Sequence, residues 1–368
     1  MQAQSSAAGE NAAADARPGL CVRIVQLDGE LPNLALMKIA GYHRERGDHI
    51  VFTRNARRAW VEPAYDRVYA STIFTRSRPL VDRLLADFPQ AIIGGTGLYD
   101  DDRFQWKRTV EDVLGIPDLN KYDYGIVPSS FTASVGMSMT GCRFACGFCR
   151  VPEKEGRARA KSDLERIWRG DPYPRYLHLM DNDFFGVPRA TWEARVQEMI
   201  DGRYRISLSQ GINVRAIDAT IAKVVRSMPL YDHKQFKTRR VYTAWDNLED
   251  EARFFRGVEH LGNAGVPLSS ILVYMLVGWD ETETFERIEE RHDKLVHLGL
   301  MPFPMVFEQT PRVTRNGIPW LELKKFQRWA IRYAKFGIPW QDYRAGARPD
   351  AMKGQPRLFT WPSLRHVA

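Results

Sequence analysis

Cysteine is scarce in this sequence, which has only four among its 368 residues. Three of them, Cys142, Cys146 and Cys149, lie within a stretch of eight residues, whereas Cys21 stands far apart. A disulfide framework needs cysteines spread along the chain, so this layout excludes one and favours a reducing compartment with a metal-binding role. For Cys21 we expect a small, buried apolar side chain.

Long apolar runs are also missing. The longest run, residues 271–279, is far short of the roughly 20 residues that a membrane-spanning helix needs. Residues 1–18 are mostly small and polar, without the basic start and apolar stretch of a secretory signal, and we expect them to form a disordered leader. These absences predict a cytoplasmic protein that does not contact a membrane.

Positive charge is in moderate excess, with a formal net charge of +8. Attraction to nucleic acid grows with the number of phosphates that a protein neutralises, so a nucleic-acid partner is one interpretation. The basic, aromatic helix predicted at 321–337 and the arginine-bearing tail after it motivate that alternative. A soluble protein that happens to be basic accounts for the same charge.

Short apolar runs alternate with segments of helical periodicity in the first third of the chain. We expect strands at 21–29, 49–53, 66–75 and 91–98, and helices at 31–47 and 78–88. Strands that alternate with helices predict a parallel sheet covered on both faces. This pattern indicates a doubly wound, Rossmann-like α/β domain, which we place at residues 19–126.

A second alternating series begins near residue 131. Its six expected strands lie at 132–140, 175–182, 204–211, 239–246, 270–278 and 302–308. Six strand and helix units predict a partial (β/α)6 TIM-type barrel at residues 127–310, with its chemistry at the carboxyl ends of the strands. Residues 311–368 are expected to form a basic helix and a surface tail with loose ends.

The first expected barrel strand leads directly into the cysteines. Residues 137–150 read MSMTGCRFACGFCR, which gives the spacing C-x-x-x-C-x-x-C after Gly141. Thiolates are the usual ligands of iron–sulfur clusters, and three ligands leave one iron of a four-iron cubane with an open position. A zinc site is the alternative, but zinc prefers four protein ligands, and no histidine or fourth cysteine lies beside this loop.

This loop resembles that of the radical S-adenosylmethionine (SAM) superfamily, which also has an aromatic residue, here Phe148, just before the third cysteine. The resemblance implies that Cys142, Cys146 and Cys149 hold a [4Fe–4S] cluster and that SAM chelates the fourth iron. It implies reductive cleavage of SAM to a 5′-deoxyadenosyl radical, which abstracts hydrogen from an unidentified substrate. It also implies an electron donor, either a reductase or a protein of the flavodoxin or ferredoxin type.

Polar residues at the ends of the later strands are candidates for the rest of a SAM pocket. The second strand ends at Asp181 and Asn182, where the family binds the methionine amine. Amide and guanidinium groups at the third strand could reach ribose hydroxyls or the cofactor carboxylate, and a carboxylate at the fourth is a plausible ribose acceptor. These residues are Gln210, Asn213, Arg215 and Asp246. Glu308, at the sixth strand, is hypothesised to meet substrate.

The first domain resembles the cobalamin-binding type of domain that precedes the barrel in some radical SAM enzymes. The segments that carry this resemblance are LPNLALMKIAGYHRERG, DRVYASTIFT and IIGGTGL, with VPEKEG beside the cysteines. Cobalamin is therefore a further candidate cofactor, and a cobalamin-assisted radical methyltransferase is the alternative activity. The chain departs from the D-x-H-x-x-G pattern, because Asp28 is followed by Gly29 and Glu30, so the lower-ligand histidine is missing.

Two other motifs are incomplete, and one further class stays open. Residues 94–97, GGTG, lack the Lys and Ser or Thr of a phosphate-binding loop and are expected to form a tight turn. Methylthiolating relatives carry extra cysteines in the first domain, which here has only Cys21, so that activity is disfavoured. A noncatalytic iron–sulfur or zinc protein remains an alternative.

Overall fold

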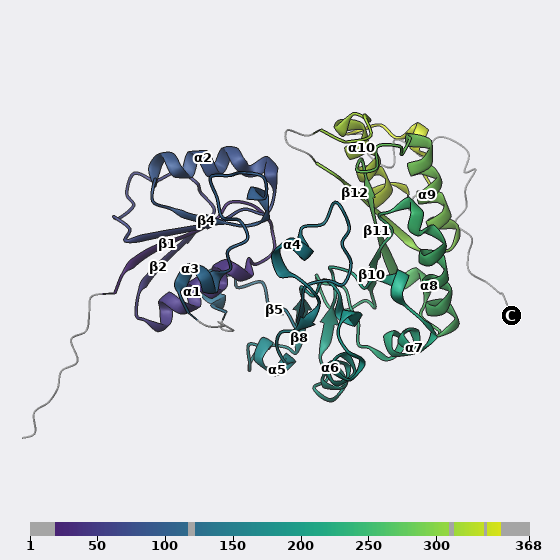
Figure 1. Ribbon diagram of the computed structural model, residues 1–368, viewed down its shortest axis with the longest axis horizontal. Helices are drawn as coiled ribbons and strands as arrows, with labels where there is room; N and C mark the ends of the chain where they lie inside the picture. The colour runs from purple at the N-terminus through teal and green to yellow at the C-terminus, as the bar shows by residue number, and fades with distance from the viewer. Residues whose placement is uncertain (1–18, 117–121, 309–312, 335–336, 347–368) are drawn as a thin grey trace, which may run out of the picture.

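The computed structural model describes residues 19–116, 122–308, 313–334 and 337–346. The expected leader, residues 1–18, and the tail beyond 346 lie outside this part. The described chain forms two α/β regions side by side, each with parallel strands and helices (Figure 1). The α/β class predicted from the alternating pattern is therefore confirmed.

The first region is built on a four-stranded parallel sheet with the order β2-β1-β3-β4. Its strands are β1 (Cys21–Gln26), β2 (His49–Thr53), β3 (Arg67–Ser71) and β4 (Ile92–Gly94). Its helices are α1 (Leu34–Glu45), α2 (Arg78–Asp87) and α3 (Val110–Leu114). Alternate residues of β1 point to opposite faces, so Val22 and Ile24 pack with α1 while Val25 packs with α2.

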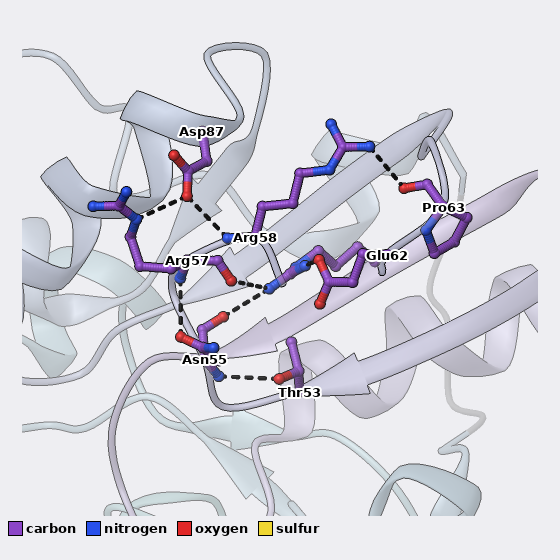
Figure 2. A network of polar contacts seen from close by, with 8 residues as sticks. Thr53, Asn55, Arg57, Arg58, Glu62, Pro63 and Asp87 are labelled. Atoms are coloured by element: carbon purple, nitrogen blue, oxygen red, sulfur yellow. Dashed lines mark hydrogen bonds and ion pairs between the residues drawn. The ribbon is translucent and has the colours of Figure 1, made fainter. Parts of the chain in front are cut away.

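An extended segment, residues 54–66, replaces a helix in the connection from β2 to β3. It is fastened by Arg23 of β1, whose side chain is completely buried. Arg23 Nη2 donates to the carbonyl oxygens of Asn55 and Arg57, each at 2.9 Å, and Arg23 also pairs with Glu62. Figure 2 shows Asn55, Arg57 and Glu62 of this segment close together. A buried charge needs such partners, so the segment is held in one conformation.

Six further parallel strands form two three-stranded sheets, each in chain order. One contains β5 (Ser134–Gly136), β8 (Tyr176–Leu179) and β9 (Arg205–Ser207), and the other contains β10 (Val241–Ala244), β11 (Ile271–Val277) and β12 (Met301–Val306). The loop after β9 joins the two sheets, because Ile212 N donates to Tyr242 O at 2.8 Å. This order is consistent with a six-unit partial barrel.

Helices follow these strands along the chain. They are the short α4 (Val151–Glu155) and α5 (Leu164–Ile167), then α6 (Arg189–Asp201), α7 (Ala219–Ser227), α8 (Glu251–Asn263), α9 (Phe285–His297) and α10 (Trp320–Arg332). In the part of the chain that the structure describes, no helix has the length and apolar character needed to cross a bilayer.

The expected strand at 132–140 is divided in two. Its first part is β5, whereas its second part, β6 (Met139–Thr140), leaves the sheet and pairs antiparallel with β7 (Arg159–Ala160). The division occurs where Ser138 turns to the buried carboxylate of Asp181, to which its backbone N–H donates at 2.7 Å. The cysteine loop therefore spans a small hairpin instead of following the sheet directly.

The basic, aromatic helix expected at 321–337 is present as α10, and its apolar face is buried. Phe326 and Trp329 are buried against His292 of α9, with ring centroids 5.8 and 4.8 Å from that imidazole. Gln327 Nε2 also donates to Pro304 O of β12 at 2.7 Å. The aromatic residues of this helix belong to the hydrophobic core, because they cover the face that β12 and α9 would otherwise expose.

Candidate functional site

The cysteine loop is closed at its base by backbone contacts. Gly141 has φ of 78°, and a Cβ at this position would lie 2.3 Å from Arg157 O. Cys142 N donates to Gly156 O at 3.1 Å. Only glycine fits at residue 141, since its conformation is left-handed and the opposite backbone is in direct contact.

The three cysteines of the loop are half-buried, and N–H groups already point toward their sulfur atoms. Phe144 N donates to Cys142 Sγ at 3.4 Å, and Arg215 Nη2 donates to Cys146 Sγ at 3.7 Å. Such bonds stabilise thiolate ligands and tune the potentials of iron–sulfur clusters. The chemistry of this donor set therefore fits a cluster with three protein ligands.

Without metal, burial favours the protonated thiols of Cys142 and Cys149. It raises the pKa of Cys142 to about 11 and also raises the pKa of Cys149. Cluster binding would release the protons, because only thiolates ligate iron.

The described residues contain no group of three or more His, Cys, Asp or Glu side chains arranged around a single metal ion. A cubane differs from a single ion in this respect, because each thiolate binds a different iron and the sulfur atoms need not converge on one point.

A cavity of about 250 Å³ adjoins the cysteine loop. Its walls come from the loop itself and from residues that follow β8, β9 and β10. The predicted residues that line it are Cys142, Cys146, Cys149, Phe148, Asn182, Gln210, Asn213, Arg215 and Asp246. Gly211, Trp245 and Phe254 add apolar surface suited to a flat ring. The structure thus brings nearly all of the predicted residues to one place.

Asp181 lies apart from this lining. Its side chain is buried and accepts hydrogen bonds from Ser138 N at 2.7 Å and Ser138 Oγ at 2.5 Å. Burial raises the pKa of Asp181 to about 6. Neighbouring Asn182 lines the cavity instead, so Asp181 connects β8 to the β5–β6 turn and does not face the cavity.

Asp246 lines the cavity two residues after β10 ends at Ala244. Burial raises the pKa of Asp246 to about 6, although Leu276 N donates to it at 2.9 Å. Behind it, Arg291 of α9 donates to Trp245 O at 3.2 Å and to Leu276 O at 2.7 Å. Arg291 and Asp246 together fix the ends of β10 and β11.

Sequence reasoning missed Arg291 and its partner Glu283. Both are buried, and they form an ion pair at 3.0 Å. The available signal was the spacing in α9, where Arg291 falls three residues after Ile288 and four before Leu295, on the apolar face of the helix. A charge on that face needs a buried partner.

Arg215 places a positive charge beside the cysteine loop. It pairs with Asp250, and its guanidinium lies 4.6 Å from the centroid of the Phe144 ring. Although burial acts in the opposite direction, the bonds to Cys146 and Asp250 raise the pKa of Arg215. A fixed cation here would offset the negative charge of a thiolate-ligated cluster.

Two further carboxylates organise the loop and were also missed. Asp183 Oδ2 accepts from Arg143 N at 3.0 Å and from Arg143 Nε at 2.9 Å, and it lies 3.9 Å from Cys142 Sγ. Glu155, six residues after Cys149, accepts three hydrogen bonds at the base of the loop. Only their position in the sequence could have indicated a role, because each lies close to residues that were already predicted to belong to the site.

The loops at the carboxyl edge of the first sheet are in contact with one another. Doubly wound sheets bind ligands where the strand order reverses, here between β1 and β3. Asp28 spans that point by accepting from Thr72 Oγ1 at 2.7 Å, Ile73 N at 2.8 Å and Phe74 N at 3.0 Å. A Cβ on Gly95 would lie 2.0 Å from Thr72 O, so the loop after β4 is packed directly on the same segment.

This edge instead faces the cysteine loop and β12 (Figure 1). Arg150, which follows Cys149, stacks 4.1 Å from the centroid of the Tyr99 ring, and Arg76 Nη1 lies 3.3 Å from Glu308 Oε2. Lys324 is the second partner of Glu308, at 3.5 Å. Glu308, which was expected to meet substrate, thus joins the two regions.

Comparisons with known proteins add little. Neither the protein-family models nor the curated proteins include a match. One solved structure, described as the apo, selenomethionine-labelled form of the cobalamin-dependent S-adenosylmethionine radical enzyme OxsB, is similar with a TM-score of 0.48 and 11% identity. The similarity covers 90% of this chain and 57% of that one, so this chain spans little more than half of that protein's length.

Proposed function

We propose that this chain is a radical SAM enzyme, with a [4Fe–4S] cluster on Cys142, Cys146 and Cys149. The observation that carries the proposal is that these three cysteines, on one closed loop, line the same cavity as polar residues from three strand ends. A site with three thiolates beside a polar and aromatic cavity suits a cluster whose open iron binds an amino acid ligand.

The chain's own residues would hold and orient the bound groups. Arg215 offsets cluster charge, Asn182 and Gln210 offer amide groups, and Asp246 offers a carboxylate at the cavity wall. When bound and reduced, the cluster would supply an electron to the sulfonium of SAM, giving methionine and a 5′-deoxyadenosyl radical that takes hydrogen from substrate. An electron donor of the reductase, flavodoxin or ferredoxin type is the partner that this chemistry requires.

No observation favours the alternative functions over this one. A cobalamin-assisted methyl transfer needs a corrinoid site, and the loops after β1, β3 and β4, which contact one another, offer no lower-ligand histidine after Asp28. Two aromatic residues of α10, Phe326 and Trp329, are buried and so cannot stack on bases.

The proposal is tested by anaerobic reconstitution with iron and sulfide. We expect about four irons per chain and, after reduction, an electron paramagnetic resonance (EPR) signal that changes shape when SAM is added, because SAM binds the open iron. Changing Cys142, Cys146 and Cys149 together to Ala should abolish both. Cys21→Ala is the matched control and should leave both unchanged. A zinc-only protein, or a cluster that SAM does not perturb, would refute the proposal.

A further inference from the structure

The Glu155 carboxylate connects three parts of the site through one oxygen atom. Its Oε2 accepts from Thr140 Oγ1 at 2.8 Å, from Gly141 N at 2.9 Å and from Asn182 Nδ2 at 3.0 Å. Thr140 and Gly141 lead into the cysteine loop, Glu155 ends α4 on the same loop, and Asn182 follows β8. One carboxylate thus ties both ends of the loop to the end of a different strand.

These bonds fix the direction of the Asn182 amide. An ionised carboxylate has only acceptors, so the amide must turn its NH₂ group toward Glu155. Its carbonyl oxygen is then left for the cavity, which Asn182 lines. Within the described ranges, no group donates a hydrogen bond to that oxygen. Asn182 therefore offers the cavity wall an oriented acceptor that no donor in the described part of the chain uses.

Glu155 cannot move independently of the cysteine loop. The loop is closed beside it, where Cys142 N donates to Gly156 O and where Gly141 touches Arg157 O. A shift of Cys142 or Gly141 would therefore displace the Glu155 carboxylate and release the Asn182 amide. The geometry links the conformation of the loop to the direction of one acceptor in the cavity.

We propose that Glu155 is a positioning residue that holds the Asn182 carbonyl oxygen toward the amino group of SAM. An amino group that binds iron through its lone pair has only N–H donors left, so a fixed carbonyl acceptor matches it, whereas a free amide could turn its NH₂ toward the ligand instead. This inference rests on the proposed function and deepens it. It makes binding of the cosubstrate depend on an ordered cysteine loop.

The test measures SAM affinity in the reconstituted, reduced protein by titrating the change in the EPR signal. Glu155→Ala should weaken SAM binding by about 10- to 100-fold. This is the usual effect of removing a residue that hydrogen-bonds to a binding group and orients it. Glu155→Gln should recover most of the affinity, because its amide oxygen can accept the same bonds. Asn182→Ala should cause a loss similar to that of Glu155→Ala, and the double variant should lose no more than either single one.

Glu153 provides the matched control. It lies on α4, but it is exposed and pairs with Arg150 at 2.7 Å and Lys107 at 3.8 Å, away from Asn182. Glu153→Ala should bind SAM as the wild type does. Iron content is measured for every variant, and if Glu155→Ala fails to hold the cluster, Glu155→Gln and Asn182→Ala carry the test, because neither removes the acceptor at the base of the loop.

The outcomes separate the two proposals. If the wild type forms no cluster or binds no SAM, the proposed function fails and this inference fails with it. If the wild type binds both but Glu155→Ala matches Glu153→Ala, only the inference is overturned. Losses that multiply in the double variant would also overturn it, since they would show that Glu155 and Asn182 act independently.

Discussion

Adjacent residues at the end of β8 have different surroundings. The sequence predicted a polar cluster after this strand, and Asn182 does line the cavity, while Asp181 is buried against Ser138. Sequence reasoning could not separate the two, because the expected strand ran to Asn182 whereas β8 ends at Leu179. Beyond a strand's last residue, alternation no longer tells which side chain faces which way.

The buried carboxyl of Asp181 gives a prediction about stability and pH. Burial raises its folded-state pKa to about 6, above the ordinary value of 3.8. A raised pKa means that the folded state binds the proton more tightly than the unfolded state does. The stability that this proton adds to the fold is fully present below about pH 4 and is lost as the pH rises through about 6. In Asp181→Asn the contribution is absent.

We therefore expect the unfolding free energy of the wild type to fall relative to Asp181→Asn between pH 4 and pH 7, by up to about 3 kcal/mol. Urea unfolding of both proteins at several pH values checks this. A difference that stays constant with pH would contradict it.

At the scale of elements, Arg291 and Glu283 link α9 to the ends of β10 and β11, and we call this set of contacts the clamp. It supports the wall of the cavity that Asp246 lines. Arg291 and Glu283 are buried together, and Arg291 also bonds the carbonyl oxygens that end both strands. Arg291→Met should lower the unfolding free energy by about 3–5 kcal/mol, because it leaves a buried carboxyl without its partner. Arg291→Met combined with Glu283→Gln should recover part of that loss. Urea unfolding tests both, and a loss below about 1 kcal/mol in Arg291→Met would refute the clamp.

Elements with strong periodicity were predictable from sequence, and those set by long-range contacts were not. Strands β9, β10 and β11 fall within their expected segments at 204–211, 239–246 and 270–278. The break between β5 and β6 was not predictable, because it depends on Asp181, 43 residues from Ser138. The packing of α10 was not predicted either: its basic and aromatic residues motivated a nucleic-acid partner, whereas its apolar stripe packs on β12 and α9.

At the scale of the whole molecule, the first α/β region serves as a wall over the cysteine loop. Its sheet edge meets the second region through Arg150 with Tyr99 and through Arg76 with Glu308. The resemblance to cobalamin-binding domains could be read from sequence, but the closure of the edge by Asp28 could not, since it depends on loops that meet only in the fold.

We predict that the purified protein does not bind cobalamin. Equilibrium dialysis against hydroxocobalamin should give equal concentrations on both sides, with no change in the absorption spectrum of the corrinoid. Stoichiometric uptake would contradict the closed edge and would restore the methyltransferase alternative. This measurement needs neither cluster nor SAM, so its result is independent of the radical chemistry.

The central claim is tested most directly by product formation. Anaerobically reconstituted protein, reduced with dithionite, is incubated with SAM, and 5′-deoxyadenosine is measured beside the triple Cys142, Cys146, Cys149→Ala variant and Cys21→Ala. The account predicts 5′-deoxyadenosine from the wild type and from Cys21→Ala, and none from the triple variant. An intact, reducible cluster that yields no 5′-deoxyadenosine would contradict it and favour a noncatalytic iron–sulfur protein.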